Sequence, residues 1–191
     1  PGIKEEEIAA DFAGCYPARP QAAVQGSYAT VDLGGRSVDS FTLAATIWPT
    51  RPDKADQGVI SLPGASGTLA IGPSGAEVRV GDAASLSVGK ALRERAWYRI
   101  WASYDSGTGA IAVGQEPLGP PTLVDDAGSQ TGSATGSGTH GGNAPLLIGA
   151  IGGTPVGGHF NGKIEAPALY DAALSPYAQA GATPVSAWNF S

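Results

Sequence analysis

The chain has 191 residues, of which 42% are hydrophobic and 15% charged, a length that suits one domain with a substantial core. It holds 29 glycines and 15 prolines, roughly twice the ordinary usage, which excludes a helical bundle or a coiled coil. The net charge of −6 without a basic cluster argues against a nucleic-acid partner, and the lack of a long apolar run argues against a membrane partner. Because the sequence contains no methionine, we expect an excised domain or a processed fragment.

The first twenty residues are predicted to form a short helix and a Pro-rich lead-in. Three consecutive acids, Glu5, Glu6 and Glu7, suit the positive end of a helix dipole at its first turn. Pro17 and Pro20 then end the helix. We therefore divide the chain into an N-terminal lead-in, residues 1–20, and a second unit, residues 21–191.

The second unit is predicted to be all β, with short antiparallel strands joined by Gly- and Pro-rich turns. The clearest strand covers residues 41–48, where apolar and polar side chains alternate with the period of two that a pleated strand imposes. The other predicted strands are 58–62, 68–71, 77–80, 85–88, 97–104, 110–114, 146–151, 160–169 and 185–190. Strands of this length and spacing are typical of a sandwich of two sheets.

Two segments are predicted to be loops or turns. Residues 119–143 consist largely of Gly, Ser and Thr, a composition that cannot bury a core, so we expect one long mobile loop there. The dipeptide Asn161-Gly162 favours a tight two-residue hairpin turn.

No catalytic residue is predicted. The formal G-x-G-x-x-G match at 136–141 lies inside the Gly/Ser loop and lacks the strand and helix that a dinucleotide site needs. No strand carries the paired carboxylates of a glycosidase: Glu77 is predicted to form an exposed pair with Arg79, and Glu165 stands alone.

The segment 97–104 carries the strongest indication of a binding surface. By alternation, one face holds Trp97, Arg99 and Trp101, two indoles around a guanidinium. Such a group stacks on a sugar or is buried by a protein partner. Together with Trp48, these residues are our predicted binding site. The alternative that loops of the same domain cover them stays open.

The strands resemble those of laminin G-like, concanavalin A-like domains. The resemblance rests on residues 41–50, on Trp97 to Gly109 with its turn, and on the closing segments 147–149, 160–164 and 169–175. It spans residues 24–190 and implies an antiparallel jelly roll of two sheets. Because many modules with this fold bind sugars, and often calcium, we name Asp82 and Asp105, both in turns, as candidate calcium ligands.

A closer resemblance is to the sandwich module in the large subunits of N,N-dimethylformamidase-like enzymes. It is carried by residues 16–20, 44–50, 92–95 and 159–169, and it departs from that module at Pro167 and in the loop 119–143. The family hydrolyses a small amide, and the resemblance implies that its catalytic residues and iron lie outside this module, which needs no cofactor of its own. The first hypothesis is thus a non-catalytic module that packs on the rest of its parent chain or on a neighbouring subunit. The second is a lectin-like module that binds a saccharide, with calcium assisting.

Overall fold

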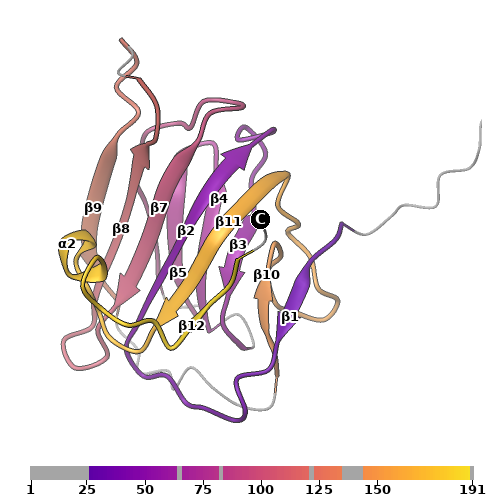
Figure 1. The fold of residues 1–191 in the computed structure, drawn as a ribbon, viewed down its shortest axis with the longest axis vertical. Helices are drawn as coiled ribbons and strands as arrows, with labels where there is room; N and C mark the ends of the chain where they lie inside the picture. Colours follow the sequence, from indigo (N-terminus) through magenta and orange to yellow (C-terminus); the bar gives the residue numbers. More distant parts are fainter. Residues whose placement is uncertain (1–25, 64–65, 82–83, 121–122, 135–143, 190–191) are drawn as a thin grey trace, which may run out of the picture.

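Two six-stranded antiparallel sheets form the protein, as the computed structural model shows (Figure 1). The structure describes residues 26–63, 66–81, 84–120, 123–134 and 144–189. The first sheet has the order β1 (Ala29–Val31), β10 (Leu146–Ile148), β3 (Gln57–Ser61), β4 (Gly67–Gly72), β5 (Gly75–Val80) and β6 (Ala84–Ser87). The second has the order β12 (Ser186–Ala187), β11 (Gly162–Tyr170), β2 (Phe41–Pro49), β7 (Tyr98–Tyr104), β8 (Ala110–Pro117) and β9 (Gly128–Ser133). The predicted all-β sandwich is confirmed.

The core lies between the two sheets and follows the predicted alternation. In β2 the side chains of Phe41, Leu43 and Ile47 are fully buried between the layers, and in β7 those of Tyr98 and Ile100 are. The intervening residues of each strand therefore point to the other side of the second sheet. We call that side the outer face.

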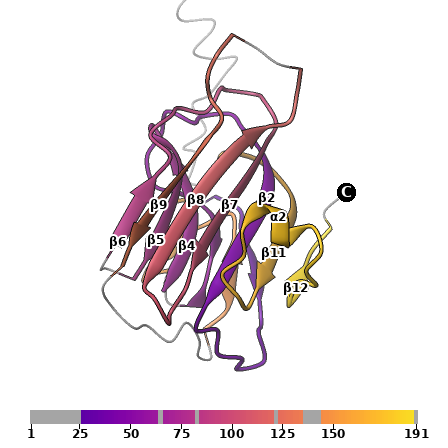
Figure 2. The same cartoon turned by 90° about the vertical axis from the view of Figure 1, so that its left-hand side faces the viewer.

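One short helix, α2 (Pro176–Gln179), interrupts the β structure. It follows β11 and precedes β12, the edge strand of the second sheet, and Figure 2 shows α2 near the β11 end of that sheet. Ser175 caps it through a hydrogen bond from the Ala178 N–H, and Pro176 occupies its first turn, where a missing N–H costs nothing. The described residues contain no helix that is long and apolar enough to span a membrane.

The prediction of one long loop at 119–143 is wrong in its middle. Residues 128–133 form β9, which pairs with β8 from Ala110↔Ser133 to Gln115↔Gly128. Nearly all of its side chains are exposed, so backbone hydrogen bonds rather than apolar burial hold it in the sheet. Residues 135–143 lie outside the described residues.

The predicted hairpin turn at Asn161-Gly162 is also wrong. Gly162 is the first residue of β11 and pairs with Pro49 of β2, far away in the sequence. Its φ of +152° and its position against β2 explain the glycine, because a Cβ there would lie 2.3 Å from the carbonyl oxygen of Trp48.

The expectations for Pro167, for the Glu77–Arg79 pair and for the N-terminal helix have different outcomes. Pro167 lies within β11 at a register shift between Glu165 and Ala168, where a missing N–H is tolerated. Glu77 and Arg79 do pair, at 2.9 Å, but their side chains are only 20% and 27% exposed, so the pair is half-buried rather than exposed. The predicted N-terminal helix lies outside the described residues, and the boundary at residue 20 stays a prediction.

Candidate functional site

The outer face of the second sheet carries the predicted binding residues in cross-strand rows. The pairing of β2, β7 and β8 places Thr46, Arg99 and Glu116 in one row. The next row holds Ala44, Trp101 and Gly114. Arg99 and Trp101 are therefore neighbours on one face, as alternation predicted.

Gly114 gives the Trp101 indole its place. A Cβ at this position would lie 2.5 Å from Cε2 of Trp101, so the ring rests directly on the backbone of β8. The indole is half-buried.

A pocket of about 370 Å³ opens beside this indole. Arg99, Trp101 and Glu116 line it from the sheet, and Pro176 and Ala180 line it from α2 and the residue that follows. An aromatic wall with one cationic and one anionic group is a combination that binds polar ligands with an apolar face.

Arg99 and Glu116 stand directly opposite each other on neighbouring strands, yet they form no ion pair within 4 Å. Arg99 instead donates a hydrogen bond from Nη2 to Oε1 of Gln179, at 3.2 Å. Gln179 is 3% exposed, and its Nε2 has no hydrogen-bond partner. The two charged walls of the pocket thus keep hydrogen-bonding capacity for another molecule.

The segment after β11 covers the middle of the outer face. The Thr42 hydroxyl donates to the carbonyl oxygen of Ala172 at 2.7 Å and accepts from the Leu174 N–H at 2.8 Å, so Thr42 is fully buried. This hydroxyl fixes the start of the segment that carries α2 over β7. The domain thus covers its own outer face at Thr42, whereas Arg99 and Trp101 line an open pocket, and the alternative that its loops cover the tryptophans stays a prediction.

Trp48 and Trp97 lie on the same face but beyond the pocket. Trp48 follows Ile47 and Trp97 precedes Tyr98, so each lies one step beyond the Ile47↔Tyr98 pair, and both are half-buried. The ammonium of Lys163 lies 5.2 Å from the centre of the Trp48 ring, within the range of a cation–π contact. The structure thus brings Arg99 and Trp101 into one pocket and leaves Trp48 and Trp97 outside it.

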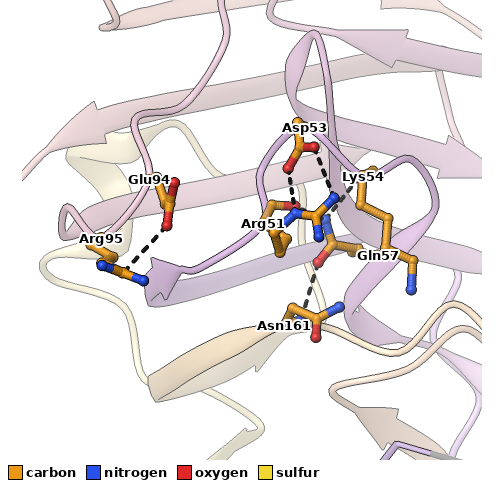
Figure 3. A network of polar contacts seen from close by, with 7 residues as sticks. All are labelled: Arg51, Asp53, Lys54, Gln57, Glu94, Arg95 and Asn161. Carbon is orange, nitrogen blue, oxygen red and sulfur yellow. Dashed lines mark hydrogen bonds and ion pairs between the residues drawn. The ribbon is translucent and has the colours of Figure 1, made fainter. Parts of the chain in front are cut away.

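A polar network fixes the loop that follows Trp48 (Figure 3). Gln57, fully buried, donates from Nε2 to the carbonyl oxygens of Arg51 and Lys54 at 2.7 and 2.8 Å, and its Oε1 accepts from the Asn161 N–H at 3.0 Å. Around it, Arg51 pairs with Asp53 at 2.9 Å on the exposed surface. The residues after β2 are thereby joined to Asn161, which directly precedes β11.

The predicted calcium ligands have different outcomes. Asp105 lies in the β7–β8 turn, where its Oδ1 accepts from the Gly107 N–H at 2.9 Å and stabilises the turn itself. Asp82 lies outside the described residues. Within the described ranges no three His, Cys, Asp or Glu residues gather in a way that suits a metal ion.

Sequence reasoning missed two residues of the site, Glu116 and Gln179. Continuing the alternation of 110–114 to Glu116 would have placed it on the outer face, opposite Arg99. Gln179 gives no such indication, because its position depends on how α2 packs on the sheet.

No family model matches the chain. Two curated proteins are similar to it, the N,N-dimethylformamidase β subunits of an Alcaligenes species and of Paracoccus aminophilus, each 29% identical over 200 residues. These alignments cover 91% and 92% of this chain but 26% of each relative, so the chain spans about a quarter of the length of the curated relatives it matches.

Solved structures of the same fold include binding modules. The CBM40 module of Ruminococcus gnavus IT-sialidase, bound to α2,3-sialyllactose, superposes with a TM-score of 0.59 at 15% identity, over 81% of this chain and 91% of that one. Domains LG4-5 of the mouse laminin α1 chain superpose with a TM-score of 0.53 at 15% identity, over 79% of this chain and 42% of that one. At this identity the likeness establishes the fold alone. The chain is thus a laminin G-like, concanavalin A-like jelly roll whose sequence resembles part of the N,N-dimethylformamidase β subunit.

Proposed function

We propose that this chain is a non-catalytic module of a larger amide hydrolase similar to N,N-dimethylformamidase, and that it serves domain packing or subunit contact. The observation that carries the proposal is the alignment, which takes in nearly all of this jelly roll and only a quarter of each curated relative. A segment of that size that folds as a two-sheet sandwich suits an accessory unit within a longer enzyme.

The outer face supplies a surface for such contact. Trp48, Trp97 and Trp101 are half-buried on it, and Arg99 and Glu116 line an open pocket. Tryptophan and arginine are the residues that most often anchor protein–protein interfaces.

The test compares the 191-residue chain with the product of the complete reading frame that encodes it. Release of dimethylamine from N,N-dimethylformamide is expected from the longer protein and not from the 191-residue chain. Hydroxyl-radical footprinting of both samples is expected to show the three tryptophans protected in the longer protein. Amide hydrolysis by the 191-residue chain would overturn the proposal, and so would a reading frame that encodes nothing further.

A saccharide in the same pocket is the second candidate function. The Trp101 face suits the apolar face of a pyranose, and the Arg99 guanidinium and Glu116 carboxylate suit its hydroxyl groups. Calcium assistance through Asp105 and Asp82 stays part of this candidate.

A thermal-shift panel tests the saccharide candidate with common mono- and oligosaccharides, with calcium and with a chelator. A sugar at about 100 times its Kd adds roughly 2.7 kcal/mol of stability, which raises the Tm by about 5–11 °C in a domain of this size. The shift is expected to disappear in Trp101→Ala and to persist in Trp48→Ala, the matched control outside the pocket. A flat panel, or an unchanged shift in Trp101→Ala, would reject this candidate.

A further inference from the structure

The connection between β8 and β9 exposes a group of apolar side chains. Leu123 is fully exposed, and Leu118 and Val124 are 47% and 54% exposed. We call these three residues the apolar trio. They are three of the four large hydrophobic side chains that the described residues expose, and the fourth, Tyr28, precedes β1. Single exposed hydrophobic residues are ordinary, but three within seven residues mark an interaction site.

A buried carboxylate holds the connection just after the trio. Asp126 is 2% exposed, and its Oδ2 accepts hydrogen bonds from Tyr98 Oη and Arg93 Nε. Its carbonyl oxygen accepts a further bond from Gln115 Nε2 at 2.7 Å. A charged group so deeply buried is rare unless it is paired, and here Arg93 and Tyr98 both bond to the carboxylate.

Two further contacts fix the ends of the connection. Lys90 Nζ donates to the carbonyl oxygen of Ala127 and pairs with Asp125, each at 2.8 Å. At the other end, the Leu118 N–H donates to the carbonyl oxygen of Trp97 at 2.8 Å, which extends the β7–β8 pairing one step beyond Tyr98↔Pro117. The backbone on both sides of the trio is therefore held while its side chains face water.

The electrostatics keep this anchor charged at neutral pH. Burial by itself raises the pKa of Asp126, but the hydrogen bonds from Tyr98 and Arg93 outweigh it and lower that pKa below its ordinary value. Burial raises the pKa of the Tyr98 phenol, and its hydrogen bond to Asp126 raises it further. The phenol thus stays a donor and the carboxylate an acceptor.

The bonded backbone at the two ends of this connection favours the binding of a partner to the apolar trio. Hydrogen bonds at Leu118, Asp126 and Ala127 already order the described backbone at these positions, so a partner has less backbone to order there when it buries the side chains. The exposed Glu116 carboxylate lies two residues before Leu118 and adds a negative charge beside the trio, whereas Asp125 is already paired with Lys90. An apolar centre with a charged rim is the usual anatomy of a protein interface.

We propose that the apolar trio docks into an apolar pocket edged by basic side chains on a neighbouring domain of the same, longer polypeptide. The inference rests on the proposed function. Two observations favour this occupant: the curated relatives are about four times as long as their alignment with this chain, and the exposed Glu116 carboxylate lies beside the trio in the sequence.

Footprinting by hydroxyl radicals tests the proposal in the 191-residue chain and in the product of the complete reading frame. The modification rate of Leu123 is expected to fall at least about five-fold in the longer protein, as for a side chain at the dry centre of an interface. Tyr28 is the internal control and is expected to react equally in both samples. Equal modification of Leu123 in both samples would overturn the inference, and if the tryptophans of the outer face are protected in the same experiment, the proposed function survives that result.

A variant sharpens the test. In the longer protein, Leu123→Asp is expected to return the modification rate of Leu118 to its value in the 191-residue chain, whereas Tyr28→Asp, the matched control, leaves it unchanged. Sedimentation velocity of the 191-residue chain tests whether a second copy of the chain binds the apolar trio instead. Self-association that Leu123→Asp abolishes would make a second copy the partner and overturn the assignment to a neighbouring domain.

Discussion

Two connections of the sandwich are anchored by buried polar side chains of different charge. Gln57, fully buried and neutral, holds the residues between β2 and β3 through two backbone carbonyls and one N–H (Figure 3). Asp126, equally deep and ionised, holds the residues between β8 and β9 through Tyr98 and Arg93. The first connection presents charged side chains to solvent, whereas the second presents the apolar trio.

The charge of each anchoring side chain corresponds to the kind of side chains that its connection exposes. Arg51, Asp53 and Lys54 are well solvated, so their loop needs only its backbone groups satisfied, and one amide does this. Exposed Leu123 and Val124 gain from collapsing onto apolar surface. A charge-assisted hydrogen bond, stronger than a neutral one, suits a connection that keeps these side chains exposed.

The largest effect is expected from removing the charged anchor. Asp126→Ala leaves the Tyr98 hydroxyl and the Arg93 guanidinium without their acceptor, so we expect a loss of about 2–4 kcal/mol in the free energy of unfolding. Urea denaturation of the 191-residue chain measures it. A loss no larger than that of Gln57→Ala would remove the distinction between the two anchors.

A smaller loss is expected from the neutral anchor. Gln57→Ala removes three hydrogen bonds at a fully buried position, which corresponds to about 1–3 kcal/mol. Hydrogen exchange is expected to speed up at the Asn161 amide, which loses its acceptor. Unchanged exchange at Asn161 would mean that Gln57 does not hold this connection.

The pH dependence separates the two anchors further. Because the pKa of Asp126 is lowered on folding, its contribution is present above the ordinary value of 3.8 and is lost as the pH falls from there through the native pKa. The stability difference between the parent chain and Asp126→Asn is thus expected to shrink below about pH 4. On the alkaline side, the pKa of Tyr98 is raised on folding. The contribution of Tyr98 to stability is therefore present below about pH 10 and is lost as the pH rises through the native pKa. Denaturation midpoints across this range test both limits, and a constant difference on the acid side would contradict the Asp126 account.

The smallest effects are expected at the surfaces that the anchors carry. Asp53→Ala breaks an exposed ion pair and Leu123→Ser removes a side chain that touches little, so neither is expected to move the urea midpoint of the 191-residue chain. A clear destabilisation by Leu123→Ser would show that this leucine packs within the module, and the docking proposal would fail.

The strands could be predicted wherever one face of them is buried, as in β2, where the alternation of Phe41, Leu43 and Ile47 is explicit. The prediction failed for β9, because the side chains of Ser129, Gln130 and Thr131 are exposed and the strand pairs through its backbone alone. The same composition hid Asp126, because nothing in the sequence separates it from its exposed neighbour Asp125 within a stretch that is typical of a loop.

The site was predictable on one strand and not across strands. Arg99 and Trp101 follow from the alternation of β7. Their pocket depends on register, which brings Glu116 opposite Arg99, and on the return of α2, which brings Gln179 to it. Register and helix docking are set by contacts between residues far apart in the sequence.

The polar character of β9 has a consequence for a protein that folds beside other domains. An outermost strand leaves unpaired backbone groups that can recruit a strand from another chain. Here β9 ends the second sheet with Gly, Ser, Gln and Thr side chains, and the other three sheet ends are strands of two to four residues, β12, β1 and β6. Among the described residues no long apolar edge is therefore offered for mispairing. The contacts that we propose with neighbouring domains then involve the outer face and the apolar trio.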